Sequence, residues 1–110
     1  MRIELITQEQ SNQLLDLMDK HKALTLQNKG YETISKKDLN DEEKEAIKEI
    51  DELLNKHIAG YSYFQNFKLN KEGKPQIRFQ YNYGYDGKGT HFIGVGYILF
   101  EELLNGFKDE

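Results

Sequence analysis

The spacing of apolar residues along this chain changes at Gly60. Before it, apolar side chains recur every three or four positions, and after it they largely recur every second position. The first period matches one face of an α-helix, and the second matches one face of a β-strand. The sequence therefore predicts a helical first half followed by a sheet.

The first helix is expected over residues 8–22. Thr7 and Gln10 have the form of a capping box at its start. Helical spacing then follows at Leu14, Leu17, Met18 and His21. Beyond this helix, residues 23–39 contain a turn signal and predict either a short strand or a loop.

A second helix is expected over residues 41–58. Asn40 and Glu43 repeat the capping signature, and Gly60 suits a left-handed end to the helix. One helical face is apolar, with Ala46, Ile47, Ile50, Leu53, Leu54 and Ile58.

Three strands follow, over residues 61–69, 77–83 and 91–99, with a closing helix bearing Leu103, Leu104 and Phe107. Alternation assigns the core face of the second and third strands to Ile77, Phe79, Tyr81, Ile93, Val95 and Tyr97. We expect a single α+β domain over residues 1–110, built as a three-stranded antiparallel β-meander packed against two or three α-helices.

The chain contains no cysteine, which excludes disulfides, zinc–thiolate sites, iron–sulfur clusters and thiol catalysis. Its first residues lack the order of a secretory signal, and no apolar run approaches the roughly 20 residues of a membrane span. We therefore expect a cytoplasmic protein without a membrane partner.

Charge is distributed unevenly along the chain. Residues 38–52 hold eight acidic residues and two lysines, a net charge of −6, whereas residues 58–100 carry +3. The second helix therefore presents an acidic face that suits a basic protein partner, with Asp41, Glu42, Glu45 and Glu49 as its candidate contacts.

The predicted sheet is unusually rich in aromatic residues. The face away from the core presents a polar and aromatic surface, and tyrosine gives a large contact area at low entropic cost. The candidate protein-binding residues of the sheet are Tyr63, Arg78, Gln80, Asn82, Tyr83 and Tyr85. Nucleic acid is a less suitable partner, because its binding usually requires a stronger basic footprint.

The glycine-rich segment at residues 84–90 is the alternative candidate site. Its glycines, Lys88 and Thr90 invite a phosphate-loop interpretation, but the spacing differs from that of a P-loop and the segment leads into a strand. His91 is the candidate for acid–base chemistry beside it. The three histidines have no metal-ligand spacing, so we expect no metal, no cofactor and no catalytic residue.

Residues 50–83 resemble part of the YezG-type family of bacterial immunity proteins. The matching features are the end of a helix, Tyr61-Ser62, Phe67-x-Leu69, Glu72-Gly73-Lys74 and Ile77-x-Phe79-x-Tyr81. The resemblance implies a small cytoplasmic antitoxin that neutralises a cognate nuclease toxin.

Two functions therefore remain open. The first is a non-enzymatic inhibitor or immunity-type protein that blocks a bacterial or phage effector, such as a basic toxin or nuclease. The second is a small-ligand-binding domain or small enzyme that uses residues 84–90, from Gly84 to Thr90, together with His91.

Overall fold

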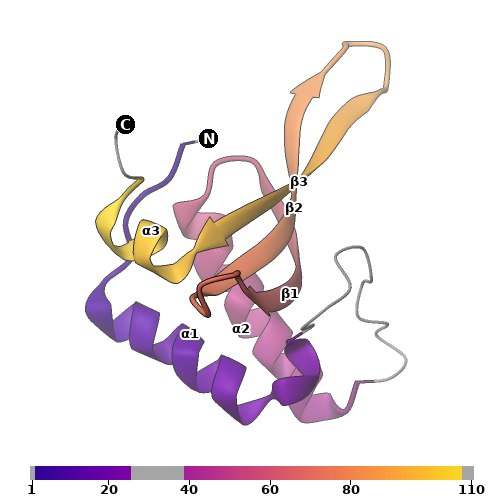
Figure 1. Cartoon of the computed structure of the whole chain (residues 1–110). Coiled ribbons are helices and arrows are strands. Elements are labelled where there is room, and N and C mark those ends of the chain that lie inside the picture. The colour runs from indigo at the N-terminus through magenta and orange to yellow at the C-terminus, as the bar shows by residue number, and fades with distance from the viewer. Residues whose placement is uncertain (1, 26–38, 108–110) are drawn as a thin grey trace.

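The computed structural model describes residues 2–25 and 39–107. Their elements, in chain order, are α1 (Gln8–Lys20), the 3₁₀ turn η1 (Lys22–Leu24), α2 (Asp41–His57), β1 (Tyr61–Leu69), β2 (Pro75–Tyr85), β3 (His91–Leu99) and α3 (Phe100–Asn105). The strands form one antiparallel sheet in the order β1-β2-β3, with the helices gathered on one side (Figure 1). The predicted α+β meander is confirmed.

Both predicted capping boxes are present. The Gln10 N–H donates to Thr7 Oγ1 at 3.1 Å, and the Glu43 N–H donates to Asn40 Oδ1 at 2.8 Å. The first helix is shorter than predicted, because it ends at Lys20 and the chain tightens into η1. Most of the turn and strand or loop expected at residues 23–39 lies outside the described residues. None of the helices in the described part of the chain has both the length and the apolar character of a membrane span.

Two β-bulges shape β1. Tyr61, Phe64 and Phe67 are three residues apart, yet all three are buried on the side of the sheet that faces the helices. The register shifts once between Tyr61 and Tyr63 and again between Phe64 and Asn66. Each bulge adds one residue and so restores the same side chain direction three positions later.

The predicted core face of β3 is wrong. Ile93, Val95 and Tyr97 are exposed on the outer face of the sheet, away from the helices. The helix side of β3 is instead formed by Gly94, Gly96 and the buried Ile98. The reason is the size of the opposing side chains on β2. Gly94 lies opposite Tyr81 and Gly96 lies opposite Phe79, so the two rings fill the space between β3 and the helices.

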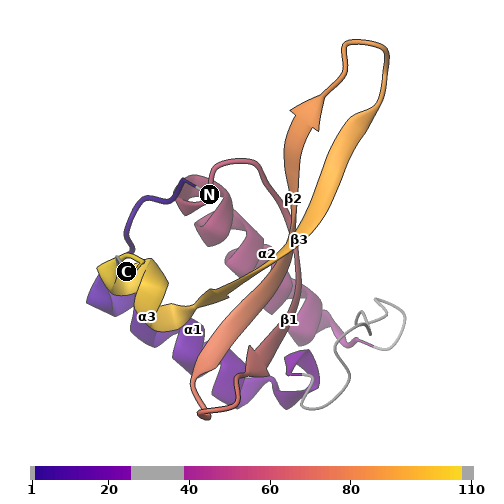
Figure 2. The ribbon, with the colours of Figure 1, turned by 45° about the horizontal axis from the view of Figure 1, so that its top comes forward.

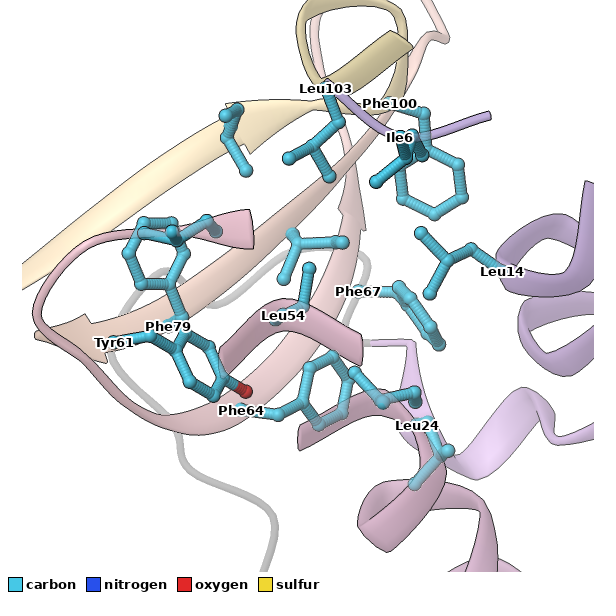
Figure 3. Packing of buried hydrophobic residues seen from close by; sticks show 14 of the residues in the cluster. Ile6, Leu14, Leu24, Leu54, Tyr61, Phe64, Phe67, Phe79, Phe100 and Leu103 are labelled. Carbon is cyan, nitrogen blue, oxygen red and sulfur yellow. The ribbon is translucent and has the colours of Figure 1, made fainter. Parts of the chain in front are cut away.

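The core lies between the sheet and the helices (Figure 3). Phe67 is central, with its ring 4.8 Å from that of Phe64 and 5.7 Å from that of Phe100, both in edge-on geometry. Leu14 and Leu24 reach it from the N-terminal helical segment, and Ile50, Leu54 and Leu103 complete it from α2 and α3. The predicted core residues Ile77 and Phe79 are fully buried.

Asp51 connects α2 to the first bulge of β1. Its Oδ1 accepts a hydrogen bond from the Tyr61 hydroxyl at 2.5 Å and another from the Phe64 backbone N–H at 2.9 Å. Burial of the Tyr61 ring, and then the hydrogen bond and the negative charge of Asp51, raise the pKa of Tyr61 well above its ordinary value of 10.0.

This contact gives stability a defined dependence on alkaline pH. Because the folded-state pKa of Tyr61 is raised, its contribution is complete below about pH 10 and is lost as pH rises further. Tyr61→Phe should lower the free energy of unfolding at pH 7 by about 1.5–3 kcal/mol, the range for a hydrogen bond to a charged group. It should also reduce the loss of stability between pH 9 and 11.

Urea denaturation at several pH values measures both effects. Tyr63→Phe, which removes an exposed hydroxyl from the same strand, is the matched control. Parallel pH profiles for the wild type and Tyr61→Phe would contradict this account.

Candidate protein-binding surface

Residues 82–93 form a two-stranded arm that projects beyond the helices (Figures 1 and 2). Every residue of the arm except Gly84 is exposed. At its base, the Asn82 N–H donates to the Gly60 carbonyl at 2.8 Å. Gly60 has a φ of 77°, and a Cβ there would lie 2.5 Å from the Asn82 carbonyl oxygen, so only glycine fits this junction.

A row of rings runs from the core along the helix side of the hairpin. Phe79 and Tyr81 have ring centroids 6.0 Å apart, Tyr81 and Tyr83 are 5.9 Å apart, and Tyr83 stacks on Phe92 at 5.9 Å. Gly94 leaves room for the Tyr81 ring, which would lie 3.0 Å from a Cβ at that position. Each ring is thus held by its neighbours, and the last two are exposed.

A bulge between Asn82 and Gly84 separates Tyr83 from Tyr85. Tyr85 pairs with His91, on the face of β3 that also carries Ile93, and the two rings stack at 4.6 Å. Because Asn82 Oδ1 accepts the Gly84 N–H, its amide nitrogen is the atom that lies 3.0 Å from His91 Nδ1. That nitrogen is a donor, so His91 Nδ1 acts as an acceptor. The imidazole is therefore held by the Asn82 amide at its edge and by the Tyr85 ring on its face.

The β2–β3 hairpin carries more than half of the large exposed apolar side chains of the described structure. Eleven large apolar side chains are exposed among the described residues, and six of them lie on β2 and β3. Tyr83, Tyr85 and Ile93 are 64%, 57% and 55% exposed. The arm carries two charged residues of opposite sign, Asp86 and Lys88. The predicted contacts Tyr83 and Tyr85 are therefore joined by Phe92 and Ile93, which the sequence interpretation did not include.

The other predicted sheet contacts lie on the outer face of the main sheet. Tyr63 is exposed and pairs with Gln80, which is half-buried. Arg78 is only 7% exposed, and its guanidinium lies 5.8 Å from the centroid of the Tyr97 ring. Tyr63 and Asn82 are therefore accessible, whereas Arg78 serves mainly to support the outer face.

The predicted acidic contacts lie elsewhere. Asp41, Glu42, Glu45 and Glu49 are all exposed on the first turns of α2. Glu42, Glu45 and Glu49 border a hollow of about 270 Å³ that also includes Lys20 and His21 at the end of α1. These turns of α2 and the tip of the arm lie at opposite ends of the molecule (Figures 1 and 2). The structure therefore separates the acidic and aromatic candidates into two surfaces.

Within the glycine-rich segment, the Asp86 carboxylate accepts hydrogen bonds from the backbone of the turn. Asp86 Oδ1 accepts the N–H groups of Lys88 at 2.7 Å and Thr90 at 3.1 Å, and the Asp86 N–H donates to the Thr90 carbonyl. The hydrogen bonds from Lys88 and then Thr90 hold the pKa of Asp86 below its ordinary value of 3.8. The Lys88 and Thr90 amides are thus already bonded to a carboxylate and are not available to a bound phosphate.

Other chemistry has little support in the described residues. Across residues 2–25 and 39–107, no group of three or more His, Cys, Asp or Glu side chains is arranged to hold a metal ion. A hollow of about 680 Å³ lies between the 70–74 turn and α3, and it includes the Lys74–Glu101 ion pair at 3.2 Å. It lies at the end of the sheet opposite the arm, so His91 does not line it.

Comparisons with protein-family models, with curated proteins and with solved structures find no match for this chain. The geometry of the described residues therefore has to support any functional proposal.

The occupied turn gives a testable expectation. Because the pKa of Asp86 is lowered, its hydrogen bonds should persist as pH falls past 3.8 and weaken only when the lowered pKa is crossed. At neutral pH, the Lys88 and Thr90 amides should exchange slowly with solvent, and added phosphate should leave their NMR shifts unchanged. In Asp86→Ala, the exchange of both amides should become at least tenfold faster.

Lys88→Ala is the matched control, because it keeps the carboxylate and removes the neighbouring cation. Phosphate-dependent shifts of these two amides in the wild type would contradict the account and favour a ligand-binding loop.

Proposed function

We propose that this chain is a non-enzymatic protein that binds and blocks another protein, as an inhibitor or immunity-type protein does, and that the arm of residues 82–93 is its main anchor. The observation that carries the proposal is the exposure of Tyr83, Tyr85, Phe92 and Ile93 on one projecting hairpin. Buried aromatic side chains supply much of the energy at the centres of protein interfaces.

The order of the arm's rings supports this role. Tyr83 stacks on Phe92, and Tyr85 stacks on His91, before any partner arrives. Side chains that are already held in one orientation lose less conformational entropy on binding than free ones do. The arm therefore combines a large contact area with a low ordering cost.

The acidic turns of α2 support a partner with a basic surface, such as a nuclease toxin. Because these turns lie far from the arm tip, we assign them to long-range attraction rather than to the same contact patch. The resemblance of residues 50–83 to YezG-type immunity proteins points to the same kind of partner, and we include a cytoplasmic antitoxin role in the proposal.

The alternative is a small-ligand-binding domain or enzyme that uses residues 84–90 and His91. It has weaker support, because Asp86 already accepts the Lys88 and Thr90 amides of the turn and His91 is exposed between Tyr85 and Asn82. An exposed site of this kind lacks the concave, water-excluding surface that small-ligand sites usually have.

The arm tyrosines provide the first test of the proposal. A partner captured from the native cell and then purified should dissociate at least tenfold faster from Tyr83→Ala and from Tyr85→Ala than from the wild type, because truncated anchors act mainly on the off-rate. Surface plasmon resonance measures the rates. Leu15→Ala, which truncates an exposed apolar side chain on α1, is the matched control and should bind normally.

Inhibition should follow binding. The wild type and Leu15→Ala should suppress the activity of the captured partner, and the Tyr83→Ala/Tyr85→Ala double variant should not. Unchanged off-rates and full suppression by the double variant would refute an arm-centred inhibitor.

Charge provides a separate test. Glu45→Lys/Glu49→Lys should lower the on-rate for the same partner and flatten its dependence on salt, since screening shortens the Debye length from about 10 Å at 0.1 M to about 3 Å at 1 M. Stopped-flow mixing at two salt concentrations measures this. Lys44→Glu/Lys48→Glu, on the same helix, should have the opposite effect. On-rates that are indifferent to all four changes would mean that the acidic turns take no part in binding.

A further inference from the structure

A bulge in β2 gives the arm two apolar faces. Tyr83 is the extra residue of β2 at this bulge, and its ring stacks on Phe92 on the helix side of the hairpin. In a regular strand, residues two apart point to the same side, so Tyr85 would follow Tyr83. The bulge instead places Tyr85 on the outer face, where it pairs with His91. The exposed rings of the arm are therefore divided between its two faces.

Each face of the arm presents two large exposed side chains to solvent. They are Tyr83 and Phe92 on the helix side and Tyr85 and Ile93 on the outer side. No third strand and no helix of the described residues lies beside this part of the hairpin (Figure 2). A partner could therefore reach both faces at the same time.

The tip of the arm is small and has no net charge. Two of the five residues at positions 86–90 are glycines, and the others include one acid, Asp86, and one base, Lys88. The Asp86 carboxylate already accepts hydrogen bonds from the Lys88 and Thr90 N–H groups. A charged group that already has hydrogen-bond partners costs less to remove from water than one without them. The tip therefore suits entry into a confined space ahead of the rings.

A flat partner surface can cover only one face of such a ribbon. A cleft with a wall on each side would cover all four apolar side chains instead of two, and burial of apolar surface is the dominant favourable term in most protein association. Apart from its tip, the arm contains no Asp, Glu, Lys or Arg. Since the buried centres of protein interfaces are depleted in charged residues, walls that match the arm are apolar.

Charge favours a different protein as the occupant. Nucleic acids and anionic membranes attract proteins through clusters of Lys and Arg, whereas this chain has a net charge of −4 and its arm has one lysine. A second copy of the chain offers a poor match at its hollow of about 680 Å³, because charged side chains that include Glu72, Lys74 and Glu101 border that hollow.

We propose that the arm enters a cleft of the partner protein, and that apolar walls of this cleft cover Tyr83 and Phe92 on one side and Tyr85 and Ile93 on the other. The inference rests on the proposed inhibitory function and adds the shape and chemistry of the partner's site, which is concave, two-walled and apolar. A protein that fills such a cleft blocks it, so binding alone is sufficient for inhibition.

Hydroxyl-radical footprinting of the unmodified chain, read by mass spectrometry, tests this arrangement. In the free chain, all four side chains should be oxidised. In the complex with the purified partner used for the off-rate measurements, each should be oxidised about three- to tenfold more slowly, since a cleft buries about 70–90% of the surface of a small ligand that it encloses. Leu15 on α1 is the matched control and should be oxidised equally in both states.

Two neighbouring residues give a second measurement. Phe92 and Ile93 follow one another on β3 but lie on opposite faces. Phe92→Lys and Ile93→Lys should each raise the off-rate from the partner at least tenfold, because each places an ammonium group against an apolar wall. A flat partner surface would tolerate one of the two changes. Surface plasmon resonance measures the rates, circular dichroism checks folding, and Leu15→Lys is the control that should bind normally.

The outcomes separate this inference from the proposed function. Protection confined to one face, or a normal off-rate for either folded lysine variant, would overturn the cleft and leave the inhibitor standing. Absence of protection at all four side chains, in a complex that still forms, would refute the arm-centred inhibitor as well. Protection of all four in the chain alone at high concentration would make a second copy the occupant and would also overturn the proposal.

Discussion

The Asp51 carboxylate fixes where α2 meets the first strand of the sheet. Two donors of β1, the Tyr61 hydroxyl and the Phe64 backbone N–H, donate hydrogen bonds to it. They lie on either side of the first bulge, so the carboxylate joins α2 to β1 at that bulge. The bulges are required because the apolar residues of β1 are three apart, so a regular strand would expose one of them. Removing the carboxylate would leave the Phe64 amide without this acceptor, and an unsatisfied buried group costs about 1–3 kcal/mol.

The arm follows from where β1 begins. Tyr61 pairs with Tyr81, and the Gly60–Asn82 hydrogen bond is the last link between the α2–β1 turn and β2. Beyond this point, no third strand or helix of the described residues lies beside β2 and β3 (Figure 2). A two-stranded ribbon is marginally stable on its own, so the stacked rings of the arm stabilise it as well as giving it an apolar surface.

Features set by short-range contacts could be predicted from the sequence, and features set across strands could not. The capping boxes at Thr7 and Asn40 are local, and both helices begin where they indicate. In β3 almost every residue is apolar or glycine, so alternation alone does not distinguish the two faces, and the assignment of Ile93, Val95 and Tyr97 to the core is wrong. The Phe79 and Tyr81 rings of β2 fill the space on the helix side of the sheet, so the opposing residues there are Gly96 and Gly94 and Val95 lies on the outer face. The bulge that turns Tyr85 away from Tyr83 likewise depends on pairing. The exposure of Ile93 could have been found from the Gly94-x-Gly96 spacing, with the two glycines assigned to the crowded helix side. Phe92 lies on the same side as the glycines, and it is exposed because the arm projects beyond the helices.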